Sequence, residues 1–211
     1  MTIKRLEAFS DGVFAVAITL LVLDLRVPDP EQLHGSLAHA LGLEWPSYAA
    51  YAVSFLVIGI IWVNHHAVMD LMARANRQLA FINLITLMTV VLIPFATALM
   101  AKYLRHANAD AHFGAAVYSA VMLAMGASFG SLWTYGAHVG KLIVPGFTDE
   151  ELRRITRRFT AGTPLYVVAL GVAFVSAPAC LALHAALALF YALSERGVGM
   201  TRPAAAGDRP S

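Results

Sequence analysis

Charged residues are scarce in this chain, and so is cysteine. Only 13% of the 211 residues are Asp, Glu, Lys or Arg, whereas 59% are hydrophobic. A soluble globular domain carries about 25% charged and about 45–50% apolar residues. A soluble fold of this length could not bury so much apolar surface, so the composition predicts an integral membrane protein in contact with lipid. The formal net charge of +2 is too small to indicate a nucleic-acid partner.

The other absences narrow the function further. The single cysteine, Cys180, lies in an apolar run and can form no intrachain disulfide, so we expect a small buried side chain there. The sequence contains no nucleotide-binding loop and no glycine-rich phosphate cradle, which argues against energy-coupled transport by this chain alone. No internal repeat is evident, which disfavours an inverted-repeat transporter. No cofactor is expected.

Long apolar segments fill most of the chain. A helix that crosses a bilayer needs about 17–25 mostly apolar residues. Six segments meet this expectation, namely 5–26, 47–70, 79–103, 112–137, 159–176 and 178–194. We therefore predict an all-α integral membrane protein with six transmembrane helices in residues 1–194. The remaining 195–211, which are rich in Pro and Ala, are expected to form a disordered cytoplasmic tail.

The division of the last apolar stretch needs an argument. Residues 159–193 would form a helix of about 52 Å, too long for one crossing of a hydrocarbon core about 30 Å thick. Pro178 lies in the middle of the stretch and disfavours helix at the preceding residue. Two short helices with a tight turn are favoured over one long kinked helix.

Basic residues are distributed asymmetrically between the two sides of this arrangement. Arg26, Lys102 and Arg105 fall on one side, and the other 12 of the 15 Lys and Arg residues fall on the N-terminal side. The positive-inside rule places that richer side, with both termini, in the cytoplasm. A compact chain of this kind suggests a prokaryotic plasma membrane.

Three local features support the helix assignments. Thr148 and Glu151 have the spacing of a capping box at the start of an amphipathic segment. Pro94 is expected to kink the third helix, either as a packing feature or as a hinge. His184 is expected to be a hydrogen-bonded core residue.

The first helix carries two chemically different faces. At about 100° per residue, one stripe is aliphatic with a single hydroxyl, and consists of Phe9, Gly12, Val13, Val16, Thr19, Leu20 and Leu23. Ser10 and Asp11 point away from this stripe. An unpaired carboxylate in a membrane is costly, so Asp11 is expected to face protein and to have a partner. Periodicity alone leaves open whether the stripe packs or lines a pore, and whether Asp11 is structural or relays protons.

The second helix has a polar cluster of its own in Trp62-Val63-Asn64-His65-His66. His66 and Asp70 are four residues apart and share a helix face, but two ligands are weak evidence for a metal. Ser10 or Ser54 near a histidine is equally weak evidence for a hydrolase. No metal site and no enzyme activity are predicted.

Arg5-x-x-x-Phe9-Ser10-Asp11 at the start of a first transmembrane helix resembles the signature of an unconventional potassium-channel family. This family comprises the transmembrane protein 175 channels of lysosomes and their single-repeat bacterial relatives. The resemblance covers the chain to about Leu193. It implies a homotetramer in which four first helices surround a central potassium-conducting pore without a carbonyl filter loop.

The resemblance also implies roles for individual residues. The pore constriction falls on Val16, with Leu20 and Leu23 as further layers, and Thr19 is similar to the threonine associated with cation selection. Val16 is smaller than the isoleucine or leucine expected at its position. The polar motif residues would anchor the first helix to its neighbours, with Trp62, His66 and Asn83 as candidate partners.

Elementary physics is compatible with such a pore. A ring of aliphatic side chains can close by dewetting, and four threonine hydroxyls can replace part of a hydration shell. Asp24 could form an acidic ring at the outer mouth, or it could be a solvated acid at a helix end. The alternative function is a proton-linked secondary transporter that uses Asp11 and His66 as its proton site.

Overall fold

The computed structural model describes residues 2–32, 35–104 and 108–194. The predicted tail, 195–211, lies outside these ranges. Within them the chain is helical, with one isolated β-bridge between Met72 and Ile143 and no strand. In chain order the elements are α1 (Ile3–Leu20), η1 (Leu21–Asp24), η2 (Pro30–Gln32), α2 (Leu37–Leu43), α3 (Trp45–Asp70), α4 (Arg77–Val91), α5 (Ile93–Tyr103), α6 (Ala109–Thr134), η3 (Tyr135–Val139), α7 (Asp149–Thr160), α8 (Gly162–Ala173) and α9 (Ala177–Ser194).

Four of the helical segments are long and apolar enough to cross a membrane. They are Ile3–Asp24, Trp45–Asp70, Arg77–Tyr103 and Ala109–Val139. These correspond to the first four predicted segments. The last two predicted segments form shorter helices, because α8 has 12 residues and α9 has 18. At 1.5 Å per residue, α8 is about 18 Å long and does not span a hydrocarbon core by itself.

The third apolar segment is interrupted at its proline. α4 ends at Val91 and α5 begins at Ile93, with Pro94 in its first turn. Proline is tolerated there because the amide hydrogens of a first turn have no partner within the helix. The segment therefore bends where the sequence predicts a kink.

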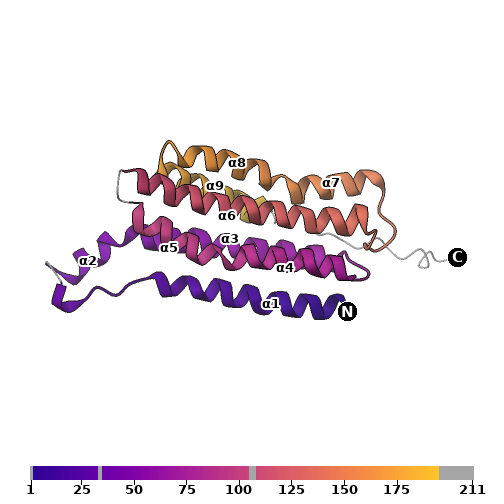
Figure 1. The fold of residues 1–211 in the computed structure, drawn as a ribbon, viewed down its shortest axis with the longest axis horizontal. Helices are drawn as coiled ribbons and strands as arrows, with labels where there is room; N and C mark the ends of the chain where they lie inside the picture. Colours follow the sequence, from indigo (N-terminus) through magenta and orange to yellow (C-terminus); the bar gives the residue numbers. More distant parts are fainter. Residues whose placement is uncertain (1, 33–34, 105–107, 195–211) are drawn as a thin grey trace.

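The C-terminal third contains a helical hairpin. α8 ends at Ala173 and α9 begins at Ala177, and the two helices pack against each other (Figure 1). The Ser176 hydroxyl accepts a hydrogen bond from the amide of Ala179 in the first turn of α9. The turn at 174–176 confirms two helices in place of one long kinked helix.

α7 has the predicted capping box. The Thr148 hydroxyl accepts a hydrogen bond from the Glu151 amide, and the Glu151 carboxylate accepts one of 2.8 Å from the Thr148 amide. These hydrogen bonds to the ionised carboxylate lower the pKa of Glu151. α7 is strongly amphipathic and buries only Ile155 and Phe159, so its basic face stays outside the bundle.

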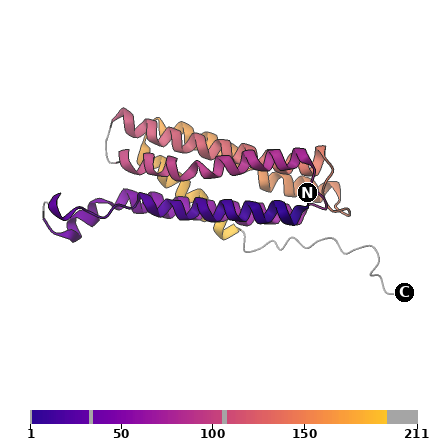
Figure 2. The same ribbon diagram turned by 60° about the horizontal axis from the view of Figure 1, so that its bottom comes forward.

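The helices form a bundle in which α1 lies along one side. α1 packs against α3 and α4, and α6 packs against α4, α5 and α8 on the opposite side (Figure 1). The start of α1, the turn at 71–76 and α7 lie at one end, whereas α2 projects beyond the other (Figures 1 and 2). Most of the basic residues in the described chain therefore share one end of the bundle.

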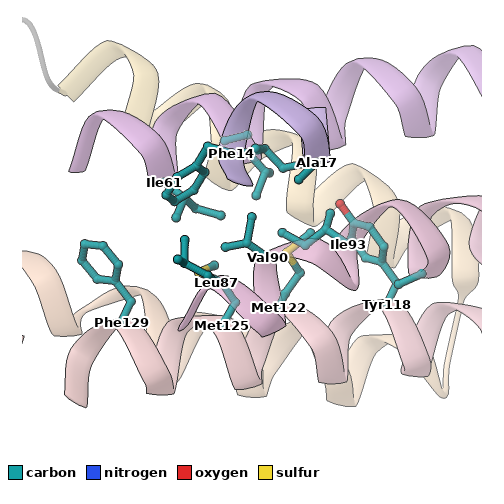
Figure 3. Close-up of a cluster of buried hydrophobic side chains, with 14 of the residues drawn as sticks. Phe14, Ala17, Ile61, Leu87, Val90, Ile93, Tyr118, Met122, Met125 and Phe129 are labelled. Carbon is teal, nitrogen blue, oxygen red and sulfur yellow. The ribbon is translucent and has the colours of Figure 1, made fainter. Parts of the chain in front are cut away.

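The core lies between α3, α4, α5 and α6, and α1 contributes only one edge to it. Figure 3 shows Phe14 and Ala17 of α1 facing Val90 and Ile93, with Met122 of α6 beyond them. In the most apolar stretch of Ile3–Asp24, which contains α1, 28% of the residues are buried. In that of Ala109–Val139, which contains α6, 61% are buried. The outer face of α1 is thus the least covered of the four long helices.

Candidate functional site: the first helix and its anchors

α1 is divided lengthwise into a buried face and an exposed face. The buried residues recur every three or four positions and are Leu6, Ser10, Phe14, Ala17 and Leu21. On the exposed face Val16 is 56% exposed and Leu23 is 74% exposed, and Gly12 and Thr19 are exposed as well. The structure therefore leaves most of the predicted aliphatic stripe partly exposed, apart from Val13, which packs against the core.

The winding of α1 changes at its outer end. Residues 21–24 form a 3₁₀ turn, in which side chains three residues apart are nearly eclipsed. Leu23 consequently lies above Leu20, which is 38% exposed, and continues the exposed face. Asp24 lies above the buried Leu21 and is turned toward the protein.

Asp24 lines a polar hollow of about 410 Å³ at this end of the bundle. Two basic residues, Arg26 and Lys102, line the same hollow, as does Glu44 at the start of α3. The 3₁₀ winding of residues 21–24 accounts for this orientation of Asp24.

Asp11 has a partner on α3. The indole Nε1 of Trp62 donates a hydrogen bond of 2.8 Å to Oδ1 of Asp11. Both side chains lie at the seam between the two helices, and Trp62 is 43% exposed. A donor that cannot itself ionise thus satisfies the carboxylate expected to face protein.

Ser10 belongs to a buried chain of hydrogen bonds. The amide nitrogen of Asn83 on α4 donates to the Ser10 hydroxyl at 3.0 Å, and that hydroxyl donates to the Leu6 carbonyl at 2.9 Å. On the other side of Asn83, its side-chain oxygen lies 2.7 Å from Nε2 of His65 on α3. With the Nε2-protonated tautomer the chain runs in one direction from α3 through α4 to α1. All of these side chains are fully shielded from solvent.

His66 is bound to a different residue of α1 from those of the motif. Its Nδ1 lies 2.9 Å from a carboxylate oxygen of Glu7. The other two motif residues, Arg5 and Phe9, face away from the buried side of α1, since Arg5 is exposed and Phe9 is 52% exposed.

Glu7 and His65 were not predicted from the sequence as anchoring residues. The adjacent His65 and His66 were a signal, because neighbouring residues on a helix point about 100° apart and so reach different surroundings.

Thr19 is the only polar side chain on the exposed face between Gly12 and Leu23. Its hydroxyl donates to the carbonyls of Ala15 and Val16, each at 2.9 Å. A hydroxyl whose proton is held by the backbone presents its lone pairs outward. The arrangement suits the coordination of a cation and does not suit nucleophilic chemistry, because no base lies beside it in the described structure.

The remaining polar residues singled out from the sequence lie in the core. His184 Nε2 lies 3.1 Å from the Ser119 hydroxyl, which also contacts Cys180 at 3.2 Å. Ser54 bonds to Tyr118 and Thr97 and lies near no histidine-based catalytic pair. These contacts join α3, α5, α6 and α9 and give no reactive group access to solvent.

Comparison with known proteins identifies the group to which this chain is related. A family model described as the endosomal/lysosomal potassium channel TMEM175 matches residues 5–94, which include α1, α3 and α4. A potassium channel of Streptomyces collinus is 53% identical over 96% of this chain and 97% of its own length. A potassium channel of Chamaesiphon minutus is 40% identical over 90% of this chain and 93% of its own length.

A solved structure has the same fold. The crystal structure of a lysosomal potassium-selective channel TMEM175 homologue from Chamaesiphon minutus superposes with a TM-score of 0.82 at 38% identity. The match covers 92% of this chain and 98% of that one. With four apolar helices of spanning length, the chain is an integral membrane protein. The similarity to full-length relatives at this identity shows that it belongs to the TMEM175 family.

Proposed function

We propose that this chain forms a potassium-preferring cation channel in which four copies of α1 surround a central pore. The observation that carries the proposal is the division of α1, whose inner face is buried and anchored while its aliphatic outer face stays partly exposed. Full-length relatives named as potassium channels, and not as enzymes, support the same function. The partners are then potassium ions, lipid and three further copies of this chain.

The closed pore is proposed to be a hydrophobic constriction. Val16, Leu20 and Leu23 lie along the exposed face, the last two brought into line by the 3₁₀ turn. Rings of such side chains exclude water when they are narrow and admit a hydrated or partly dehydrated ion when they widen. The shorter side chain of Val16 makes a wider ring than leucine would in the same backbone position.

Selectivity is proposed to lie in a ring of Thr19 hydroxyls. The backbone hydrogen bonds of this side chain fix its rotamer, so the lone pairs of four copies could converge on the axis and replace part of the hydration shell of an ion. Asp24 is proposed as the acid nearest the outer mouth. Its neighbours Arg26 and Lys102 would offset part of its charge.

The diameter of the pore is proposed to depend on the anchors behind α1. Ser10 and Asp11 bind Asn83 and Trp62, and His66 binds Glu7, so three contacts hold α1 against α3 and α4. Arg5 and Phe9 point away from the chain's own helices and are available to a neighbouring copy. Widening the pore would require α1 to move against these contacts.

A six-crossing topology with cytoplasmic termini is proposed from the hairpin and the charges. α7 and α8 together extend from the basic end, and α9 returns from the turn at 174–176 (Figure 1). The start of α1 and the arginine-rich α7 share that end, which the positive-inside rule assigns to the cytoplasm. In a bacterial cell this membrane would be the plasma membrane.

The proton-linked transporter has less support. Its two proposed proton carriers bind different residues, because Asp11 accepts from Trp62 and His66 lies against Glu7. No hydrogen bond joins the two within the described part of the chain. A relay between them would need a rearrangement of α1.

Potassium flux into liposomes that contain the purified protein tests the channel directly. We expect wild-type flux without an imposed proton gradient, greater flux for Val16→Asn because a polar ring holds water, and weaker potassium preference for Thr19→Ala. Val175→Asn is the matched control, because Val175 is 81% exposed at the hairpin turn, away from α1. Thr19→Ser restores a hydroxyl and should retain the preference.

A proton-linked transporter predicts a different result in the same flux assay. If wild type moves potassium only against a counter-flow of protons, and Val16→Asn and Thr19→Ala behave like wild type, the pore assignment is wrong. Saturation of the flux with rising potassium concentration would point the same way.

A further inference from the structure

Three metal-ligating side chains meet where α1 crosses the cytoplasmic third of α3. Glu7 extends from α1, and His66 and Asp70 extend from successive turns of α3. The ligand atoms of all three lie within 4.8 Å of one another. His66 and Asp70 are four residues apart, so their side chains leave the same face of α3.

The closest contact in the cluster is not a hydrogen bond. Nδ1 of His66 lies 2.9 Å from Oε1 of Glu7, yet this oxygen is shielded from solvent and has no hydrogen-bond partner in the described structure. Two ligands held about 2.0–2.1 Å from a tetrahedral ion lie about 3.3 Å apart. At 2.9 Å the two atoms are at ion-pair distance, so they would separate by a few tenths of an ångström to bind one ion.

We propose that Glu7, His66 and Asp70 bind a transition-metal dication of the Zn²⁺ type, which links the pore-lining α1 to α3. Imidazole nitrogen and carboxylate oxygen are both donors that zinc accepts, and three such ligands would leave a fourth position to water. The imidazole disfavours Mg²⁺ and Ca²⁺, which take oxygen ligands. His66 and Asp70 are exposed on the surface of the chain, so the protein itself does not block an ion from the site.

A bound ion would act on the anchor of α1. The site lies one turn from the Asp11 and Trp62 contact and joins the same two helices. An ion that binds only when α1 lies against α3 stabilises that arrangement by mass action. Cytoplasmic dications of this class would then resist any movement of α1 that widens the pore.

Cobalt titration of the purified, metal-free protein measures the site without any assay of conduction. Tetrahedral Co²⁺ absorbs strongly in the visible range, and Zn²⁺ should abolish the band by competition. We expect about one Co²⁺ per chain, and a loss of affinity of at least about tenfold in Asp70→Asn and in Glu7→Gln, because metal sites lose about that much when even a supporting group is removed. Asp70→Asn is the more direct variant, because Asp70 takes no part in the hydrogen bonds that anchor α1.

Asp110→Asn, at the opposite end of the bundle, is the matched control and should bind Co²⁺ like wild type. Zn²⁺ should also raise the thermal midpoint of wild type and of this control, but not that of Asp70→Asn. The proposal would be overturned if wild type, Asp70→Asn, Glu7→Gln and Asp110→Asn all bound Co²⁺ with equal affinity. It would also be overturned if wild type bound no Co²⁺ up to millimolar concentration. An equal thermal shift in Asp70→Asn would overturn it as well. Neither readout depends on whether the protein conducts potassium.

Discussion

Trp62 and Asp11, 51 residues apart in the chain, are joined by a hydrogen bond of 2.8 Å from the indole Nε1 to Oδ1 of the carboxylate. The bond ties the N-terminal half of α1 to α3 at a point where both side chains are partly exposed. A hydrogen bond to an ionised acceptor contributes about 1.5–3 kcal/mol, and partial exposure moves this contact toward the lower figure. It is therefore a contact that substitution can weaken without unfolding the bundle.

Trp62→Phe removes the donor and keeps an aromatic ring at the seam. We expect a thermal midpoint a few degrees below wild type and altered potassium flux, because α1 is held less firmly. Asp11→Ala should have a similar effect, whereas Asp11→Asn keeps an acceptor oxygen and should be milder. Thermal denaturation, followed by size-exclusion chromatography, measures the thermal midpoint, and a liposome assay measures the potassium flux. A double variant that loses no more than either single one would show that the two residues act as a pair.

The Asn83 side chain makes hydrogen bonds to both Ser10 and His65, so its substitution should lower stability more than that of Trp62. Asn83→Leu leaves the Ser10 hydroxyl and the His65 imidazole without this partner in a fully buried site. An unsatisfied buried polar group costs about 1–3 kcal/mol, so the thermal midpoint should fall further than in Trp62→Phe.

The control for this substitution lies one turn along α4. The Thr86 hydroxyl bonds only to the carbonyl of Ile82 in its own helix. Thr86→Val should therefore change the midpoint little. Equal losses in Asn83→Leu and Thr86→Val would show that general packing of α4, and not the hydrogen-bond chain, determines the stability.

The sequence was sufficient to predict the two faces of α1, because an ideal helical period separates Ser10 and Asp11 from the aliphatic stripe. The helical period alone could not identify the partners, since neither Trp62 nor Asn83 is close to α1 along the chain, and the family resemblance was the only ground on which both were named as candidates. His65 and His66 are about 100° apart on α3, and only the packing shows that one enters the buried chain and the other meets Glu7. The orientation of Asp24 toward a hollow in the bundle could not be predicted either, because the winding changes from α to 3₁₀ at Leu21.

Helix number was the less predictable part of the fold. The apolar length of residues 159–194 predicts two crossings, and the structure has a helical hairpin there, but neither helix is among the four candidate membrane spans. The apolar segment nevertheless begins as the amphipathic α7, so α8 is only 12 residues long. A length filter treats an apolar run as one helix, and it did not register the break at Ala161, although Gly162 and Pro164 follow that residue directly.

The contact between η3 and the α3–α4 turn predicts a position where even one methyl group should be harmful. A Cβ atom added at Gly136 would overlap the buried side chain of Met72 and lie 2.8 Å from its sulfur. Gly136→Ala should lower the thermal midpoint. Met72→Ala should partly restore it in the double variant.

Gly130 provides the comparison within the same helical segment. A Cβ atom there meets only Thr160, at an ordinary 3.6 Å. Because alanine is favoured over glycine within a helix by about 1 kcal/mol, Gly130→Ala should leave the midpoint unchanged or raise it. A fall in both variants would mean that the helix as a whole, and not the Met72 contact, resists substitution.

The two faces of α1 can be separated by cysteine accessibility. Val16→Cys and Ala17→Cys are neighbours in sequence, but Val16 is 56% exposed and Ala17 is completely buried. If the exposed face lines a water-filled path, a charged thiol reagent should inhibit potassium flux in Val16→Cys and leave Ala17→Cys unaffected. Thr19→Cys should respond like Val16→Cys.

Wild type is the control, because its only cysteine, Cys180, is buried among α6, α8 and α9 and should not react. Inhibition of Ala17→Cys without inhibition of Val16→Cys would require α1 to be rotated by about 100°, which its buried contacts with α3 and α4 do not allow.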